Sequence, residues 1–393
     1  MTRTPLDRHW LRGFSRRVVT ALRGRDWTRP DGQCRQSPDW LVLGINNVCN
    51  LHCKMCHVGL GGSDTVFWAN LIGDSPHDMS VDLLQEILTQ ARAFWPRPGI
   101  GLAFTEPLIH PRILEIARAI VEQGFYCAIT TNGMMLPRLA DALVDIGVHD
   151  LTLSADGPAP VHNRIRGGRN SFERLYQGVE LVNAAKARGD RRYPLVRFSF
   201  TTTDHNCGDV LAFVQAVEPL RPVSINISQL NFITAEMAQA HNAAYPSVAV
   251  TRSNLGTMDP AAFDTAGLWA ELERVRAYAR TRGEAFPLLS LAPNPANREA
   301  LTQYYHDPLT FVGGRQCTDP WRMMMIKTDG SVIPSHGRCY NYTIGNVESE
   351  PLSSLWNNDR FREFRQMLRQ GGGTLPACAR CCGVVGKPAP GTS

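Results

Sequence analysis

Cys49-Asn-Leu-His-Cys53-Lys-Met-Cys56 places three cysteines within eight residues, in the spacing C-x3-C-x2-C. Thiolates are soft ligands that select iron–sulfur clusters or zinc. Three of them can hold one face of a four-iron cubane and leave its fourth iron open. With His52 or His57 as a fourth ligand, they could instead complete a zinc site. The run follows the apolar stretch 40–45, which is predicted to be a β-strand.

The 393-residue chain contains eleven cysteines, and their distribution is uneven. Three lie in the run above, and five lie in the last 77 residues. No charged and then apolar leader opens the chain, so we expect a cytoplasmic protein. So many thiols in such a protein indicate metal or redox chemistry rather than a disulfide framework. Two separate sulfur sites are the simplest interpretation.

Short apolar runs alternate with amphipathic stretches from residue 40 to about residue 292. Strands are expected at 40–45, 99–104, 126–130, 150–154, 196–202, 224–229 and 287–291. Helices are expected at 79–95, 111–123, 136–146, 171–188, 208–217 and 266–282. This alternation predicts parallel βα units. In barrels of such units the chemistry lies on loops that follow the strands, and the cysteine run is one of these loops.

With these features the sequence resembles the radical S-adenosylmethionine (SAM) superfamily, whose α/β fold is a partial (β/α)6 barrel. The resemblance implies that Cys49, Cys53 and Cys56 hold a 4Fe-4S cluster whose open iron binds the amino and carboxylate groups of SAM. An electron from the cluster cleaves SAM, and the resulting 5′-deoxyadenosyl radical abstracts hydrogen from a substrate. The family usually has an aromatic residue before the third cysteine, where Met55 supplies an apolar cover here.

Two loops after later strands extend the resemblance. Phe104-Thr-Glu-Pro107 resembles the family's Gly-Gly-Glu-Pro motif, which implies that Glu106, with Thr105 beside it, meets the ammonium group of SAM. The alternative is a glutamate at a helix N-terminus. Thr131 and Asn132 belong to a Thr-Thr-Asn-Gly loop that suits a tight turn facing the cofactor, although Asn-Gly is also a generic turn.

A Ser-x-Asp-Gly loop with Ser154 and Asp156 precedes an Ile-Arg-Gly segment with Arg166. The resemblance implies that Ser154 and Asp156 hydrogen-bond the ribose or the substrate. Arg166 would pair with the SAM carboxylate, because a guanidinium binds a carboxylate through two hydrogen bonds. As isolated residues, Ser154 and Asp156 could equally form a turn. Asn206 and Gln229 are further candidates for polar contacts, with a helix N-cap as the alternative for Asn206.

The C-terminal part places cysteines around a predicted hairpin at 325–333 and after a predicted helix at 358–369. Such cysteines can close one tetrahedral sulfur shell. This arrangement resembles the short "twitch" form of the SPASM extension, a small α+β domain that binds an auxiliary 4Fe-4S cluster. The implied ligands are Cys317, Cys339, Cys378 and Cys381, with Cys382 as a spare or as a replacement for Cys381. A zinc ribbon-like site is the alternative.

The expected organisation has five parts: an N-terminal extension (1–39), the barrel (40–292), a linker (293–316), the auxiliary domain (317–385) and a tail (386–393). Apolar residues recur at helical spacing in 1–29, among eight arginines and two aspartates, which predicts a basic amphipathic helix. It could lie on an anionic membrane surface. We favour packing across the barrel with the arginines in water. Segment 234–265 is expected to be a long loop near the substrate entrance.

Charge and hydropathy narrow the possible partners. The net charge of +5 belongs to residues 1–29, because the other 364 residues hold 33 Lys and Arg against 34 Asp and Glu. The body of the protein is therefore not expected to bind nucleic acid. No run of 18 apolar residues predicts a membrane span. The resemblance implies an external one-electron reductant of the flavodoxin or ferredoxin type.

The resulting hypothesis is a radical SAM oxidoreductase, of dehydrogenase type, that acts on a sugar, a cyclitol or another small natural product. The 39 residues before the first strand are too few for the leader-binding domain that peptide-modifying relatives often carry. Epimerisation, with Cys207 as hydrogen donor, and peptide maturation remain alternatives, and Cys207 could also be an ordinary buried cysteine. A non-catalytic iron–sulfur electron carrier is the alternative from a different class.

Overall fold

The computed structural model describes residues 26–27, 29–73, 75–312, 316–334 and 342–381. Cys339 and Cys382 of the predicted second sulfur site lie outside these ranges, as does nearly all of the basic helix predicted in 1–29. Within the described ranges, no helix is long and apolar enough to cross a membrane.

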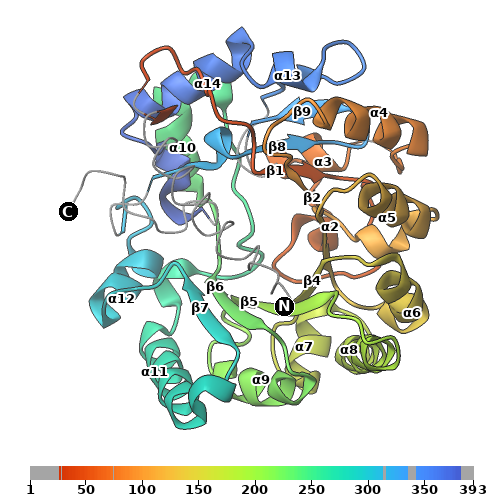
Figure 1. The fold of residues 1–393 in the computed structure, drawn as a ribbon. Coiled ribbons are helices and arrows are strands. Elements are labelled where there is room, and N and C mark those ends of the chain that lie inside the picture. The colour runs from red at the N-terminus through yellow and green to blue at the C-terminus, as the bar shows by residue number, and fades with distance from the viewer. Residues whose placement is uncertain (1–25, 28, 74, 313–315, 335–341, 382–393) are drawn as a thin grey trace, which may run out of the picture.

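Seven parallel strands follow one another in chain order and form a curved sheet inside a ring of helices (Figure 1). They are β1 (Trp40–Leu43), β2 (Gly99–Leu102), β3 (Cys127–Thr131), β4 (Asp150–Ser154), β5 (Leu195–Thr202), β6 (Ser224–Gln229) and β7 (Leu288–Ala292). Each coincides with a predicted strand to within three residues at either end. The predicted α/β barrel of parallel βα units is confirmed.

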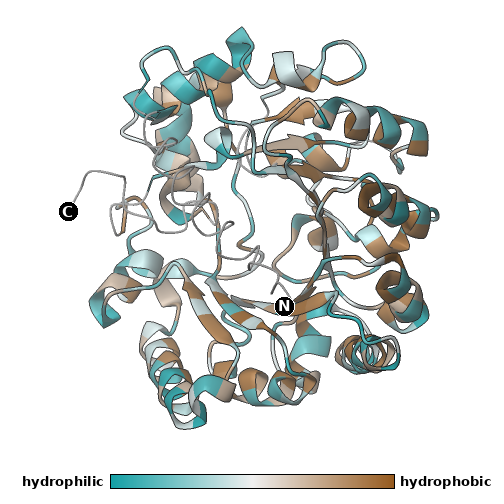
Figure 2. Cartoon of the chain, viewed as in Figure 1, coloured by the Kyte–Doolittle hydropathy of each residue, from teal (hydrophilic) through white to brown (hydrophobic). Residues whose placement is uncertain are grey.

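Six amphipathic helices cover the outside of this sheet. They are α4 (Val81–Ala91), α5 (Ile113–Glu122), α6 (Leu136–Ile146), α8 (Ser171–Arg188), α9 (Val210–Val217) and α11 (Thr265–Arg282). Their apolar faces pack on the strands, as when the ring of Phe213 in α9 lies 4.9 Å from that of Phe200 in β5. Figure 2 shows the same division, with apolar surfaces turned toward the sheet and polar surfaces turned outward.

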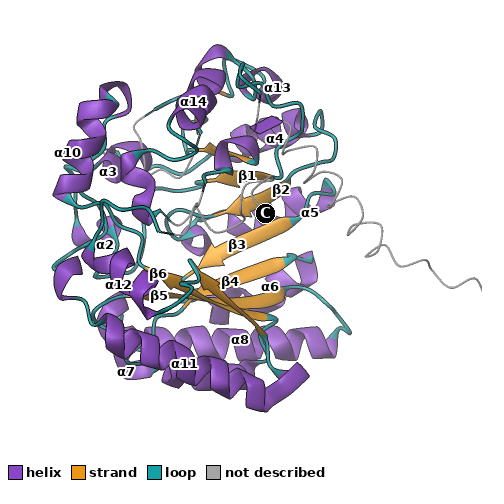
Figure 3. Ribbon diagram, turned by 90° about the vertical axis from the view of Figure 1, so that its left-hand side faces the viewer, coloured by secondary structure: helices purple, strands orange, loops and turns teal. Residues whose placement is uncertain are grey.

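Shorter helices on the loops after the strands were not predicted from the sequence (Figure 3). They are α2 (His57–Leu60), α3 (Val66–Leu71), α7 (Ala159–Arg166), α10 (Ala235–Ala244) and α12 (Arg298–His306). The predicted loop 234–265 is therefore wrong in part. Helix α10 begins there because the Thr234 hydroxyl accepts a hydrogen bond from the Met237 amide at 3.1 Å and caps the helix.

The C-terminal part continues the barrel sheet instead of forming a sheet of its own. Strands β8 (Met323–Ile326) and β9 (Ser331–Ile333) form the predicted hairpin, and β10 (Gly345–Asn346) pairs with β9. Strand β8 also pairs in parallel with β1, so one ten-stranded sheet runs from β10 to β7. The predicted helix at 358–369 is α14 (Asp359–Gln370), which follows the short helix α13 (Leu352–Leu355).

The inner face of the sheet, opposite the helices, has two chemically different halves. Alternation along the strands turns Thr152, Ser154, Ser199, Thr201, Asn226 and Ser228 inward, and all of them are half-buried. On β1 and β8 the inward residues Val42, Met323 and Met325 are apolar, and they pack with Phe67 and Leu71 of α3. The barrel interior is therefore polar along β4–β6 and apolar where the C-terminal hairpin joins.

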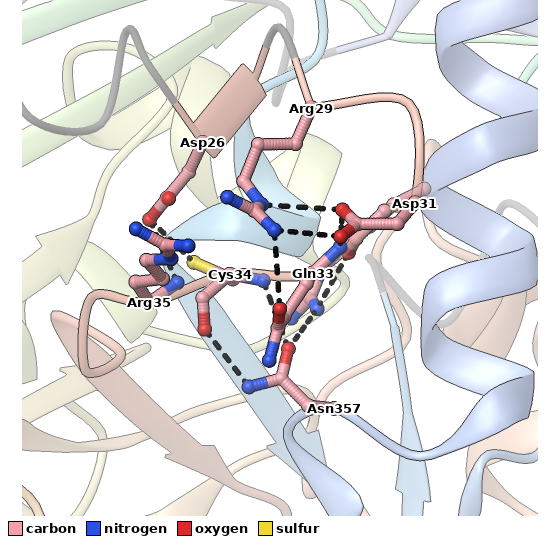
Figure 4. A network of polar contacts seen from close by, with 9 residues as sticks. Asp26, Arg29, Asp31, Gln33, Cys34, Arg35 and Asn357 are labelled. Atoms are coloured by element: carbon pink, nitrogen blue, oxygen red, sulfur yellow. Dashed lines mark hydrogen bonds and ion pairs between the residues drawn. The ribbon is translucent and has the colours of Figure 1, made fainter.

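The segment before β1 is held by the C-terminal part of the chain (Figure 4). The Cys34 amide donates to the side-chain oxygen of Asn357 at 2.9 Å, and the Asn357 side-chain nitrogen donates back to the Cys34 carbonyl at 2.8 Å. Asp26 accepts from the Arg35 and Gln36 amides at 2.9 and 3.1 Å. Burial raises the pKa of the Cys34 thiol to about 12, so Cys34 is an inert packing residue.

Candidate active site and cysteine centres

The loop with Cys49, Cys53 and Cys56 follows β1 and is held by the end of α7. The His52 amide donates to the Arg166 carbonyl at 3.2 Å, and the Lys54 amide donates to the Ile165 carbonyl at 2.9 Å. Gly167 ends α7 with a φ of 71°, and a Cβ there would lie 2.9 Å from the His52 carbonyl oxygen. The Ile-Arg-Gly segment therefore holds the cysteine loop by backbone hydrogen bonds. Gly167 is required there because its φ is positive and because a side chain would collide with the His52 backbone.

Arg166 brings a positive charge to this loop. Its guanidinium forms a 2.6 Å ion pair with Asp156 and lies 3.9 Å from the sulfur of Cys53. Burial raises the pKa of the Cys53 thiol to about 12, and Arg166 opposes that rise. The other carboxylate oxygen of Asp156 accepts from the Thr201 amide at 2.9 Å. Both oxygens of Asp156 thus bind the protein itself, which makes Asp156 the residue that holds Arg166.

Glu106 is fully buried between the two predicted cofactor loops. Its carboxylate accepts hydrogen bonds of 2.6 Å from the Thr131 hydroxyl and from the Asn132 amide, and one of 3.0 Å from the Leu108 amide. Burial raises the pKa of Glu106 to about 7, although these hydrogen bonds and Arg166 lower it. The Asn132 side chain also reaches the Cys49 sulfur at 3.9 Å. The structure therefore brings the Glu-Pro and Thr-Asn loops together beside the cysteines.

Phe104 and Thr105 stand where the family motif has two glycines. Phe104 has a φ of 88°, a conformation that glycine adopts readily and other residues rarely do. Its ring lies over Gly44, where a Cβ would be 2.7 Å away. The Thr105 hydroxyl donates to the Asn46 carbonyl at 2.8 Å, and the Asn46 side chain donates to the Glu106 carbonyl at 2.8 Å. Phe104 thus adopts a backbone conformation that glycine favours, although it is not a glycine.

A narrow cavity of about 10 Å³ lies beside the cysteine loop. Its wall combines polar and apolar side chains and is formed by Lys54, Met55, Ile165, Thr203, Asp204, His205, Leu230, Leu255, Thr257 and Met258. Met55 is half-buried there, and its role as an apolar cover for the cofactor stays a prediction. His57, considered above as a zinc ligand, is turned away, because its Nε2 accepts from the Asn254 amide at 2.8 Å.

Other predicted polar contacts are used inside the fold. The Asn206 side chain accepts from the Thr203 amide at 2.6 Å and donates to the Asp156 carbonyl at 3.0 Å, so it closes a turn. The N-cap of α9 is Asp209 instead. Gln229 points toward α12, where its side-chain oxygen accepts from the Tyr305 hydroxyl at 3.0 Å. Gln229 is therefore not placed for the predicted polar contacts with cofactor or substrate, because alternation along β6 turns it to the helix side. Ser154, by contrast, faces inward at the end of β4.

Cys207 and Cys127 lie away from both cysteine sites. Cys207 is half-buried against the main hydrophobic core. Burial raises the pKa of its thiol, and Asp264 at the N-cap of α11 raises it further. This position supports the ordinary packing role more than the role of a hydrogen donor. Cys127 is fully buried in β3, where burial raises the pKa of its thiol to about 12.

The second site brings together three of its four predicted ligands. Cys317 is buried, and its thiol pKa lies well above the usual range because of burial, Asp319 and the nearby thiols of Cys378 and Cys381. The Cys317 amide donates to the Gly373 carbonyl at 2.8 Å, and the Cys381 amide donates to the Cys378 carbonyl at 3.1 Å. These bonds fix the backbone on both sides of the thiols.

The donor set of both sites suits an iron–sulfur cluster. Soft thiolate ligands select iron–sulfur clusters or zinc, and three cysteines can hold a four-iron cubane and leave its fourth iron open. In the second site, the thiols of Cys378 and Cys381 are close enough to Cys317 to raise the pKa of its thiol.

Comparison with known families agrees with this geometry. The family model of the radical SAM superfamily matches residues 43–193, from the end of β1 to the start of β5. The chain belongs to the radical SAM superfamily. A model of the SPASM iron–sulfur cluster-binding domain matches residues 317–382. This radical SAM enzyme therefore uses a 4Fe-4S cluster and SAM, and its SPASM domain carries an auxiliary iron–sulfur cluster.

Two curated relatives align along most of this radical SAM chain. One is the tungsten-containing aldehyde ferredoxin oxidoreductase cofactor-modifying protein of Pyrococcus furiosus, 23% identical over 87% of this chain and 86% of the relative. The other is the pre-heme d1 synthase of Dinoroseobacter shibae, 24% identical over 89% of this chain and 81% of the relative. The AdoMet-dependent heme synthase of Methanosarcina barkeri is 32% identical over 38% of this chain and 40% of its own length.

Solved structures share the fold. SuiB of Streptococcus suis, solved with its precursor peptide SuiA, superposes with a TM-score of 0.58 at 15% identity and covers 98% of this chain and 78% of its own. The structure of anSMEcpe with AdoMet has a TM-score of 0.57 at 16% identity, over 84% of this chain and 80% of its own. At these identities the likeness concerns the fold alone.

Proposed function

We propose that this radical SAM enzyme is a dehydrogenase of a polar small molecule, such as a sugar, a cyclitol or another natural-product intermediate. The observation that carries the proposal is the polar inner face of β4–β6. Hydroxyl and amide side chains from three neighbouring strands are half-buried there, on the same sheet whose loops carry Glu106 and Arg166. Such a wall suits a substrate that is itself rich in hydroxyl groups.

The bound cluster and SAM supply a 5′-deoxyadenosyl radical, which removes one hydrogen atom from the substrate. The side chains of the first site prepare that event. Glu106 presents a buried carboxylate to the SAM ammonium, with Thr131 and Asn132 fixing its orientation. Arg166, held by Asp156, offers its charge to the SAM carboxylate and to the cysteine sulfurs. Met55, which is half-buried beside the cysteine loop, would offer an apolar contact to the same space.

The proposed oxidation converts a carbinol into a carbonyl group. One hydrogen atom leaves the carbinol carbon and ends in 5′-deoxyadenosine. The hydroxyl proton would leave to solvent, and an auxiliary cluster held in the SPASM domain would supply the acceptor for the remaining electron. An external one-electron reductant of the flavodoxin or ferredoxin type supplies the electron that cleaves SAM. Cys317, Cys378 and Cys381 hold the auxiliary cluster in this scheme, with Cys339 as the predicted fourth ligand.

The names of several relatives support a small-molecule substrate over a peptide. Pre-heme d1 synthase, AdoMet-dependent heme synthase and GTP 3′,8-cyclase are named for small molecules. Pre-heme d1 synthase aligns along 89% of this chain, and the other two align along 38% and 37% of it. The names of these relatives refer to different small molecules, so they support a small-molecule substrate in general and not one particular compound.

Anaerobic reconstitution with iron and sulfide, followed by dithionite and SAM, tests the proposal. We expect release of 5′-deoxyadenosine and, with a panel of polyols deuterated at their carbinol carbons, transfer of deuterium into it together with a carbonyl product. Peptides of random sequence serve as the matched panel for the competing maturase function. Failure to release 5′-deoxyadenosine with the first cluster intact would refute catalysis. Deuterium transfer from peptides alone would refute the small-molecule assignment.

A further inference from the structure

Arg380 lies between two ligands of the second site, Cys378 and Cys381, and its side chain is fully buried. Its guanidinium donates hydrogen bonds to five main-chain carbonyl groups. The acceptors are Gln303 (3.0 Å), Tyr304, Asp307 (2.5 Å), Thr310 (2.8 Å) and Ala379 (2.8 Å). Four of these carbonyls belong to a segment about 70 residues earlier in the chain. The loop of the second site is therefore tied to another part of the molecule by one side chain.

That other part is the C-terminal end of α12 (Arg298–His306). The last carbonyl groups of a helix have no partner inside the helix, and they carry a partial negative charge. Gln303 and Tyr304 are in the last turn of α12, and Asp307 is its C-cap. Arg380 meets both needs, because it donates to these carbonyls and brings a positive charge. The guanidinium also lies 4.8 Å from the centre of the Tyr304 ring, within the range of a cation–π contact.

The same contacts continue toward the first site. The Tyr304 hydroxyl donates to the Leu230 carbonyl at 2.8 Å, and the Phe232 amide donates to the Arg380 carbonyl at 3.3 Å. Leu230 in turn lines the narrow cavity beside Met55, the residue before Cys56. A continuous set of hydrogen bonds and packing contacts therefore runs from the Cys378–Cys381 loop to the small cavity beside the cysteine loop of the first site.

We propose that Arg380 is a positioning residue, which fixes the Cys378–Cys381 loop on the end of α12 and so sets the place of the auxiliary cluster relative to the first site. The proposal rests on the SPASM cluster and not on the identity of the substrate. Arginine is needed because its planar fork has five N–H donors, whereas a lysine ammonium has three on a flexible stem. The positive charge alone would not hold five carbonyl groups from two segments.

The test uses a Cys49→Ala, Cys53→Ala, Cys56→Ala background, in which the auxiliary cluster is the only one present. Arg380→Lys keeps the charge and removes the fork. We expect an altered electron paramagnetic resonance spectrum of the reduced cluster, a shifted midpoint potential and iron below about four per chain. In the chain with its first cluster intact, SAM cleavage without substrate should stay within twofold of the wild type. An unchanged spectrum, potential and iron content in Arg380→Lys would overturn the proposal.

Arg365→Lys is the matched control. Arg365 is equally buried and lies in the same C-terminal part. It donates hydrogen bonds to the Pro320 and Gly32 carbonyls at 2.8 and 3.2 Å. Its guanidinium lies 4.4 Å from the centre of the Trp356 ring. It has no hydrogen bond to the Cys378–Cys381 loop among the described contacts. We expect it to lower thermal stability while leaving the auxiliary spectrum unchanged. Equal spectral changes in both variants would show general destabilisation and would also overturn the proposal.

Hydrogen exchange of the cluster-free chain tests the proposed link first in the wild type and then in Arg380→Lys. If Arg380 joins the two segments, the amides at the end of α12 and those of residues 378–381 should open together, with similar protection. Arg380→Lys should then speed exchange in both segments, by tenfold or more. Independent opening of the two segments in the wild type would contradict the proposed link.

Discussion

The two cysteine sites of this enzyme are built in different ways. The first lies on one continuous loop, and charged side chains surround it: Arg166 approaches Cys53, while Glu106 lies behind Asn132. The second is assembled from distant segments, and a network of main-chain carbonyls around Arg380 holds part of it. At the first site, burial raises the pKa of the Cys53 thiol and Arg166 opposes that rise. At the second site, burial raises the pKa of the Cys317 thiol and Asp319 raises it further.

This difference follows from what each site binds. SAM is a charged ligand with ammonium and carboxylate groups, so the first site needs oriented charges of both signs. The auxiliary cluster has only to be held in place and kept from water, so its site can rely on packing and backbone hydrogen bonds. Substitutions at the first site should therefore affect cofactor binding and cleavage, and substitutions at the second should affect the fate of the substrate electron.

Loss of the first site should have the largest effect. In the Cys49→Ala, Cys53→Ala, Cys56→Ala variant, 5′-deoxyadenosine release should fall by at least about 10³-fold, because residues that act as a unit fail together. Iron should fall by about half, to the amount held by the auxiliary cluster. Chromatographic assay of 5′-deoxyadenosine and iron analysis measure both effects. Residual SAM cleavage near the wild-type rate would contradict the assignment of these ligands.

Loss of the second site should separate cleavage from turnover. Cys378→Ala together with Cys381→Ala should also remove about half of the iron, while SAM cleavage in the absence of substrate stays within a few-fold of the wild type. Oxidised product should become undetectable, because the substrate radical loses its electron acceptor. The ratio of 5′-deoxyadenosine to product is the measurement. If that ratio equals the wild-type value, the auxiliary cluster has no part in the oxidation.

The same contrast explains what could be predicted from the sequence. The proposed ligands Cys49, Cys53 and Cys56 are encoded by local spacing, and the strands by local hydropathy, so both are visible along the chain. Glu106 and Thr131 were predicted from short motifs, but not that one binds the other, because their contact joins two strand ends. The role of Asp156 in holding Arg166 depends on α7, a short helix with no clear hydrophobic pattern.

Other features depend on tertiary structure and left little local signal. Arg380 stands in a short Cys-x-x-Cys loop where an arginine is expected to be exposed, and only the fold shows that the end of α12 buries it. The pairing of β8 with β1 joins segments almost 300 residues apart. Gln229 was chosen as a candidate for polar contacts by its position at a strand end, but the side of the strand on which it lies depends on register.

Substitution of Arg166 should have the next largest effect, which is a loss of affinity for SAM. Arg166→Lys removes the fork that bridges Asp156 and the cysteine loop, so the SAM dissociation constant should rise about 10- to 100-fold. Arg197→Lys is the matched control, because Arg197 of β5 pairs with Asp150 at the start of β4 at 2.7 Å, away from the cysteine loop. It should leave affinity unchanged. Equal losses in both variants, measured by equilibrium dialysis, would contradict a specific role for Arg166.

Glu106 should make SAM binding depend on pH. Its folded-state pKa of about 7 lies above the ordinary 4.5 because of burial, so a proton competes with the SAM ammonium for the carboxylate below neutral pH. SAM affinity should fall as pH decreases below about 7, by up to about tenfold per unit, and level off above it. Glu106→Gln should bind more weakly and without this slope. A wild-type affinity that is constant between about pH 6 and pH 8 would contradict the predicted competition.

The titration of Glu106 also has a consequence for folding, with the opposite sign. A raised folded-state pKa stabilises the protein below the unfolded value of 4.5, and this contribution is lost as pH rises through about 7. The unfolding free energy of the cluster-free wild type, relative to Glu106→Gln, should therefore decrease over that range. Urea titrations at several pH values measure the difference. An increase with pH would mean that the carboxylate gains more from its hydrogen bonds than burial costs.

Substitution of Phe104, which lies where the barrel meets the C-terminal hairpin, should give the smallest effect, a change in the free energy of unfolding. Its ring packs in the inner apolar cluster with Met325 and Ile333 of the C-terminal hairpin, while its backbone has the positive φ of 88°. Phe104→Ala and Phe104→Gly both remove the ring, but only glycine relieves the backbone strain. The glycine variant should therefore be more stable than the alanine variant by about 1 kcal/mol, even though glycine is the more flexible residue when unfolded. Urea unfolding of the cluster-free chains compares the two. If alanine is the more stable, the backbone at Phe104 is not strained, and the ring alone explains why this motif can lack its glycines.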